Sequence, residues 1–169
     1  MSASFYDQSI PALTLGLTNL SALLDKATAH ADAKKIEPKV LADTRLIADM
    51  FPLARQVQIT CDTAKGAAGR LAGVEIPKHE DTETTIAELK ARIAKTLAFI
   101  GTVKPAQFEG AESREIVLQF PRSTLKFTGG DYLRKFVLPN FYFHIAIAYA
   151  LLRSNGVEIG KNDYLGAIQ

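Results

Sequence analysis

The sequence has few of the residues from which disulfide frameworks, metal clusters and nucleic-acid surfaces are built. It contains one cysteine, Cys61, so an internal disulfide is excluded and a cysteine-based zinc or iron–sulfur centre is not expected. Basic and acidic residues number 20 and 18 and are mixed along the chain, with no basic block. Nucleic acid is therefore not the expected partner. The single cysteine is typical of a reducing compartment.

A signal peptide and a long uninterrupted apolar run are also missing. Residues 1–6 lack a basic region followed by an apolar stretch. The most apolar segment, residues 136–152, contains Pro139, Asn140 and His144 and falls short of the roughly 20 residues that span a membrane. We expect a buried helix here, a cytoplasmic location and no membrane partner. With 47% hydrophobic residues, the chain is expected to form one domain over residues 1–169.

Apolar residues recur at helical spacing in four stretches of the chain. The first covers about residues 10–33. The second covers about residues 38–71 and is interrupted by Pro52, so it either kinks there or consists of two helices. The third begins near residue 81 or 82 and ends before Gly101. The last runs from about residue 131 or 139 to residue 154, and the tail after it is expected to fold back over the helices.

Between the third and last helices the apolar period changes from helical to alternating. Ile116, Leu118 and Phe120 stand at alternate positions, which predicts a hairpin over residues 114–128. A lone hairpin is marginally stable, so it must pack on the helices or on another subunit. The whole pattern predicts a mainly α protein, a four-helix bundle with a short β-hairpin between the third and fourth helices.

The least ordinary motif lies in the last helix and reads Pro-Asn-Phe-Tyr-Phe-His over residues 139–144. Asn140 and His144 are four residues apart and share a helix face. A histidine among so many apolar residues is expected to be buried and to need a hydrogen-bond partner. It could be a metal ligand or general base, or a core histidine bonded to a carbonyl or carboxylate. The core interpretation is favoured, because a metal site usually needs three or four ligands.

The second helical stretch carries two polar rows. One row could line a cavity inside the bundle, and the other is expected to be a solvated face with local ion pairs such as Asp62–Lys65. Asp49 and Gln56 are preferred for the cavity because Pro52 lies between them. In the last helix, Tyr149 could bind an anion or pack against a neighbouring helix. The rows are Arg45, Asp49, Gln56, Thr60 and Thr63, and Arg55, Gln58, Asp62 and Lys65.

Four stretches of the sequence resemble an uncharacterised bacterial family, the domain of unknown function nineteen ninety-three. They are Arg45 to Leu53, Arg55 to Gln58, Leu138 to His144 and Gly156 to Gly166. The resemblance covers nearly the whole chain and implies a place in the DinB/YfiT-like group of helical bundles. Members of that group are four-helix bundles, often homodimers, and many carry a metal on three histidines. They include thiol-dependent transferases, isomerases and metal hydrolases.

The resemblance also implies which metal ligands are retained. In typical metal-binding members the last helix carries two histidines four apart, followed by a Leu-Arg pair and a glycine, and Leu152, Arg153 and Gly156 match that ending. His144 falls on the second histidine position, but Asn140, a poor transition-metal ligand, stands at the first. The second helix offers no histidine. The resemblance therefore implies a degenerate site, whose candidate pocket residues are His144, Asn140, Asp49, Gln56 and Tyr149.

Functions of different classes follow from this interpretation. The first is a metal-free protein that binds a small molecule or serves as a scaffold, expected as a homodimer. The second is a metal- or thiol-dependent transferase or hydrolase that uses His144 in an atypical site, with a divalent metal held only weakly there. In a third, His144 is purely structural and the dimer surface carries the function. The sequence leaves open whether the protein is an enzyme and names no substrate.

Overall fold

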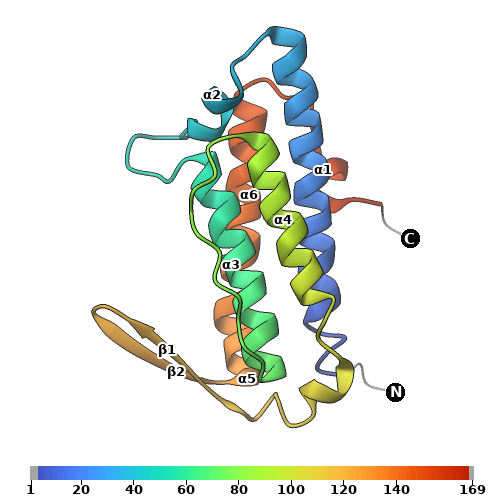
Figure 1. Cartoon of the computed structure of the whole chain (residues 1–169), viewed down its shortest axis with the longest axis vertical. Coiled ribbons are helices and arrows are strands. Elements are labelled where there is room, and N and C mark those ends of the chain that lie inside the picture. The colour runs from blue at the N-terminus through green and yellow to red at the C-terminus, as the bar shows by residue number, and fades with distance from the viewer. Residues whose placement is uncertain (1–3, 168–169) are drawn as a thin grey trace.

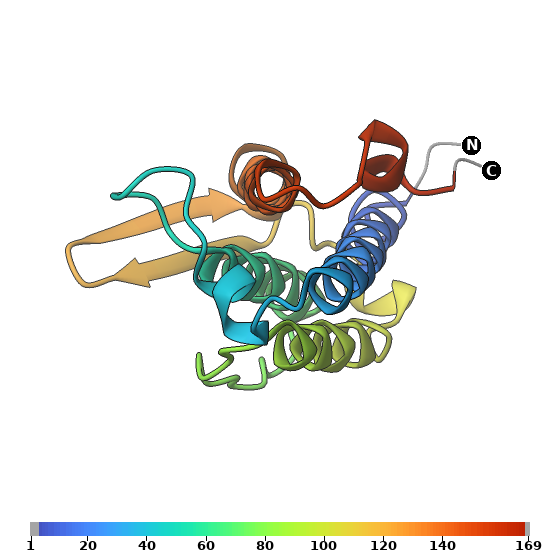
Figure 2. The ribbon, with the colours of Figure 1, turned by 90° about the horizontal axis from the view of Figure 1, so that it is seen from above.

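The computed structural model describes residues 4–167, and four long helices lie side by side along its longest dimension (Figure 1). Helix α3 packs against α4 and α6, and α1 packs against the same two helices, so the four surround a common core. Figure 2 shows this arrangement from above. The mainly helical class expected from the sequence is confirmed. The four helices are α1 (Ile10–Lys34), α3 (Leu53–Ala72), α4 (Ile86–Ile100) and α6 (Leu138–Ser154).

The second helical stretch is broken rather than kinked. It forms a short helix, α2 (Pro38–Asp43), a loop over residues 44–52, and then α3. Pro52 lies in an extended conformation just before α3, where its missing N–H removes no helical hydrogen bond. The loop is closed by a bond from the Leu53 N–H to the Thr44 carbonyl oxygen at 3.0 Å. Asp49 therefore belongs to a loop and not to the helix face predicted for it.

The third helix begins later than the sequence pattern predicts. Helix α4 starts at Ile86, with Thr85 as the residue that caps it. The Thr85 hydroxyl accepts from the Glu88 N–H at 3.3 Å, while the Glu88 carboxylate accepts from the Thr85 N–H at 3.0 Å. This reciprocal capping box sets the helix start. Asp81 and Glu83 lie outside the helix because both are held by the side chain of Arg92.

A two-stranded antiparallel hairpin stands out from the lower part of the bundle (Figure 1). It follows the 3₁₀ turn η1 (Pro105–Phe108), and its strands are β1 (Glu115–Phe120) and β2 (Ser123–Thr128). The register pairs Glu115 with Thr128 and Phe120 with Ser123. Within β1, only Ile116 and Leu118 are buried. The hairpin therefore packs on the bundle through one face of β1.

The chain from Gly129 to Ser154 is one helical stretch with a change of pitch in its first half. A short turn α5 (Gly129–Asp131) leads into the π-helical segment η2 (Tyr132–Val137), which leads into α6. The wider π turn stands directly before Pro139 near the start of α6. By length and composition alone this stretch could cross a membrane, a test that the core helix of a soluble protein also passes.

The tail after α6 returns to the bundle, as the sequence suggested. A short helix, α7 (Lys161–Leu165), packs against α1. The Asn19 side chain on α1 donates to the carbonyl oxygens of Leu165 at 2.9 Å and Tyr164 at 3.2 Å. These bonds satisfy carbonyl groups at the end of α7, where no further helical partner follows.

Candidate functional site

A row of polar side chains crosses the otherwise apolar interface between α3 and the last helix. His144 is buried on α6, and its Nδ1 lies 2.7 Å from Oε1 of Gln56, which is buried on α3. Gln56 Nε2 donates to the Phe51 carbonyl oxygen at 3.0 Å. The Gln56 amide therefore connects loop 44–52 to the last helix. The structure brings together two of the residues predicted for the pocket.

These two bonds assign the position of the proton on the His144 ring. Because Gln56 Nε2 donates to Phe51, its Oε1 faces His144 and must accept, which places the proton on Nδ1. Burial, and secondarily the positive charge of Arg55, lower the pKa of His144 below its usual value. The ring is therefore neutral near pH 7, and its Nε2 carries the lone pair that can accept a proton.

Two further pairs of side chains extend the polar row along the interface. Asn140, one helical turn before His144, donates from Nδ2 to the Thr63 hydroxyl at 3.0 Å. Arg70 Nη1 donates to the Tyr132 hydroxyl at 3.3 Å. The α3 members are seven residues apart, so they share one helix face. We call this set the polar row, and its three pairs are Gln56–His144, Thr63–Asn140 and Arg70–Tyr132.

A pocket of about 190 Å³ opens beside the polar row, where β1 leaves the bundle. Leu118 of β1 and Phe136 give it apolar walls, and the Phe136 ring stacks on the Tyr132 ring with centroids 5.8 Å apart. The Arg70 guanidinium is half-buried and forms no ion pair within residues 4–167. Asp62 also lines the pocket, but its Oδ1 pairs with Arg92 and Lys65, so Arg70 faces the pocket without an ion-pair partner of its own in the described chain. The lining includes Thr63, Arg70, Leu118, Tyr132, Phe136 and Asn140.

Two of the predicted pocket residues lie elsewhere. Asp49 is exposed in loop 44–52 and, within residues 4–167, makes no hydrogen bond or ion pair with the other four candidates. Tyr149 turns toward the C-terminal tail, where its ring meets that of Tyr164 edge to face with centroids 6.0 Å apart. Tyr149 therefore packs against a neighbouring helix, α7, which was one of the two alternatives for it.

The donor set at the polar row does not fit a transition-metal centre. Asn140 and Gln56, the other polar candidates of the row, are amides that already bond to Thr63, Phe51 and the His144 ring itself. Over residues 4–167, no group of three or more His, Cys, Asp or Glu side chains is placed to hold a metal ion. The polar row offers one imidazole as a metal ligand, whereas a zinc site needs three or four strong donors.

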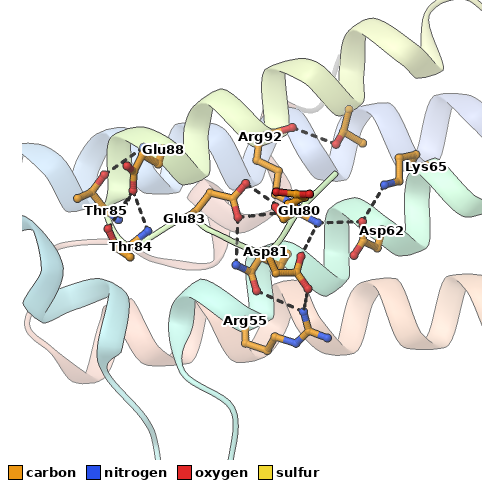
Figure 3. Close-up of polar contacts among 12 residues, drawn as sticks. Arg55, Asp62, Lys65, Glu80, Asp81, Glu83, Thr84, Thr85, Glu88 and Arg92 are labelled. Carbon is orange, nitrogen blue, oxygen red and sulfur yellow. Dashed lines mark hydrogen bonds and ion pairs between the residues drawn. The ribbon is translucent and has the colours of Figure 1, made fainter. Parts of the chain in front are cut away.

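A second polar cluster, which the sequence analysis missed, surrounds Arg92 of α4 (Figure 3). The Arg92 side chain is 1% exposed, and its Nη2 lies 2.9 Å from both Asp62 and Asp81. Its Nη1 lies 3.1 Å from Glu83. Lys65 is buried beside it and pairs with Asp62 at 3.1 Å. The expected Asp62–Lys65 pair exists, but it belongs to this buried network and not to a solvated face.

A signal for this cluster was present in the sequence of the third helix. Arg92 and Thr96 interrupt the apolar stripe formed by Leu89, Ile93 and Ile100. A charge inside a buried stripe requires partners of opposite charge. Cys61 lies close by and is no nucleophile, because burial raises the pKa of its thiol to about 12 against the opposing effect of Thr96.

Comparison with known proteins places this arrangement in a family. Residues 5–165 match the family described as Domain of unknown function (DUF1993). Among solved structures, the crystal structure of a DinB family member protein from Shewanella denitrificans is similar, with 46% sequence identity and a TM-score of 0.88 over 96% of this chain and 92% of that chain. No protein with a curated function matches the chain. The chain therefore belongs to the DUF1993 family of DinB-like helical proteins.

Proposed function

We propose that this protein, a four-helix bundle of the DinB/YfiT type, binds a small organic acid in the pocket beside the polar row, without a transition metal. The observation that carries the proposal is the half-buried Arg70 guanidinium, which faces the pocket without a carboxylate partner in the described chain. A partly desolvated positive charge is costly unless an anion or water compensates it. A ligand carboxylate supplies that compensation and can accept two parallel hydrogen bonds.

The walls of the pocket indicate the rest of the ligand. Leu118 and Phe136 offer apolar surface in the same pocket as Arg70, and the Tyr132 hydroxyl and Asn140 amide offer hydrogen bonds. Binding pockets for small molecules combine such apolar walls with a few fixed polar groups. A compact molecule with one flat apolar face and one carboxylate matches this lining.

A thermal-shift screen of aromatic and aliphatic monocarboxylates, followed by calorimetry of the hits, tests the proposal. The variant Arg70→Met should weaken binding at least roughly tenfold, since hydrogen bonds to charged groups contribute about 1.5–3 kcal/mol. Arg134→Met is the matched control, because Arg134 is exposed and pairs with Glu112 at 3.0 Å. Equal affinity of the Arg70 variant and the parent protein would refute the assignment of Arg70 as the anion-binding group.

A second candidate function is an enzyme, a metal- or thiol-dependent transferase or hydrolase in which His144 acts as a base or as one ligand of an atypical site. It is supported by the proton assignment, because Gln56 holds Nδ1–H and leaves the lone pair on Nε2. Elemental analysis of the purified chain against His144→Ala separates the two. Near-stoichiometric metal that the variant loses would support an atypical metal enzyme and lead to thiol-transfer and hydrolysis assays. Equal, negligible metal in both would support metal-free binding.

We also propose that the protein is a cytoplasmic homodimer, with or without a scaffold role. Loop 44–52 and the hairpin project from the same side of the bundle (Figure 2). Both carry exposed apolar side chains, with Ile47 62% and Phe51 53% exposed on the loop and Phe120 45% exposed on the hairpin. Exposed apolar clusters often mark protein interfaces. Light scattering should give twice the chain mass, and Ile47→Asp with Phe51→Asp should reduce it to one chain.

A further inference from the structure

A second cavity, polar and of about 200 Å³, lies between α4 and the segment of residues 77–85 that precedes it. It is separate from the pocket at Arg70 and lies on the α4 side of α3. Arg92, the hub of the buried cluster in Figure 3, forms part of its wall. Its lining includes Lys78, His79, Glu80, Glu83, Arg92 and Lys95.

Two buried nitrogen atoms of this cavity have no hydrogen-bond partner within residues 4–167. They are Nε of Arg92, whose side chain is 1% exposed, and Nδ1 of His79. Buried polar atoms in folded proteins are nearly always paired with protein, water or an ion. One water occupies about 30 Å³ of liquid volume, so this cavity has room for a small ion as well as water.

Three cations and two carboxylates, Glu80 and Glu83, line the cavity, so the lining carries an excess of one positive charge. Lys78 and Lys95 line it and form no ion pair within the described chain. Glu83 is already engaged, because its carboxylate accepts from Arg92 at 3.1 Å and from Gln58 at 3.0 Å. The pKa of His79 is lowered by burial first and then by the cations Lys65, Arg92 and Lys95, against the opposing effect of Asp62.

We propose that this cavity is a binding site for a small oxyanion, a phosphate or carboxylate group that accepts hydrogen bonds from Arg92 Nε–H and His79 Nδ1–H. Lys78 and Lys95 stand at the lining as further cations. Charge-assisted bonds of this kind are about twice as strong as neutral ones. The site is independent of the organic-acid pocket, so either can exist without the other.

Nitrogen-15 NMR of the three histidine rings in the full chain tests this proposal. Sodium phosphate and, separately, sodium acetate are titrated against sodium chloride at matched ionic strength. We expect a saturable change of the His79 ring resonances, with a rise of the His79 pKa as the anion binds. The resonances of His144, bonded to Gln56, should stay unchanged. The more potent of the two salts identifies phosphate or carboxylate chemistry.

Single-charge variants at the rim test the assignment without removing the buried arginine. Lys95→Gln should weaken binding by up to about fivefold, the range of an exposed charge pair. Glu80→Gln should tighten binding, because it removes a like charge from the lining. Lys104→Gln, at an exposed position outside the cavity, is the matched control and should change nothing. Arg70→Met should also leave phosphate binding intact.

The proposal is overturned if neither phosphate nor acetate gives a saturable His79 shift, or if chloride gives the same shift. It is also overturned if Lys95→Gln and Glu80→Gln both bind as the parent protein does. Either outcome would assign the two unpaired nitrogens to water that fills the cavity.

Discussion

The bond between Gln56 and His144 should be measurable as a coupling free energy of unfolding. Gln56→Met keeps the length of the side chain and removes both amide bonds. The Phe51 carbonyl can turn to water because Phe51 is 53% exposed, but His144 is 8% exposed and its Nδ1–H loses its partner. An unpaired buried donor costs about 1–3 kcal/mol. For a domain of this size the melting temperature should fall by about 2–12 °C.

A double-mutant cycle with His144→Phe separates this bond from general packing. If the bond exists, the two substitutions together should destabilise the protein by less than the sum of the single effects, with a coupling of about 0.5–3 kcal/mol. The measurement is urea unfolding followed by circular dichroism at pH 7.5. Additivity within about 0.3–0.5 kcal/mol, as for independent sites, would refute the bond and the proton assignment that depends on it.

Three further outcomes follow from buried groups. The pKa values of His144 and His79 lie below their unfolded value of about 6.5, so the unfolded state binds more protons than the folded state. The free energy of unfolding, measured by urea titration, should therefore fall as the pH drops below 6.5. His144→Phe should make that fall smaller. Cys61 should react with a thiol reagent only in denaturant, because its pKa is about 12; fast native reaction would contradict its burial. Gly129→Ala should lower the free energy of unfolding by about 1–3 kcal/mol, because a Cβ would overlap the Ala111 carbonyl oxygen. Gly160→Ala is the control and should leave stability unchanged in the same thermal melts, because a Cβ there would meet no atom within 4 Å.

The positions of helices and strands were predictable where apolar residues recur at a regular spacing up to a local stop signal. The first helix, expected over residues 10–33, extends over Ile10–Lys34 because its leucine stripe repeats without a break. The hairpin segment, expected over residues 114–128, contains strands Glu115–Phe120 and Ser123–Thr128. In both cases the information lies within the segment itself, so a local pattern is sufficient.

Two helix boundaries were predicted only in part. Asp81 and Glu83 are typical of a helix start, yet both are drawn to Arg92, and α4 begins only at Ile86. The capping box of Thr85 and Glu88 was a local signal for the start of α4, which the acidic residues before it obscured. The break at Pro52 was one of two outcomes left open by the sequence, because a proline can kink a helix or end it, and the structure shows the break.

The candidate site was partly predictable for a similar reason. Gln56, Asn140 and His144 were identified because helical spacing places them on single faces, and they do line one interface. Arg70 and Tyr132 were missed because their pairing depends on how two helices cross, 62 residues apart in the sequence. Spacing along one helix carries no information about which residue of another helix lies opposite it.

The two ends of the polar row differ in a way that favours one of them for the proposed binding of an anion. At the end with Gln56 and His144, donors and acceptors satisfy one another, and the groups are neutral. At the end with Arg70, a full positive charge meets only a neutral phenol, whose pKa burial raises. The free energy that remains to be gained from a ligand is therefore concentrated at Arg70. An anion that binds this chain through the polar row should approach that end, with His144 within the same interface but bonded to the protein itself.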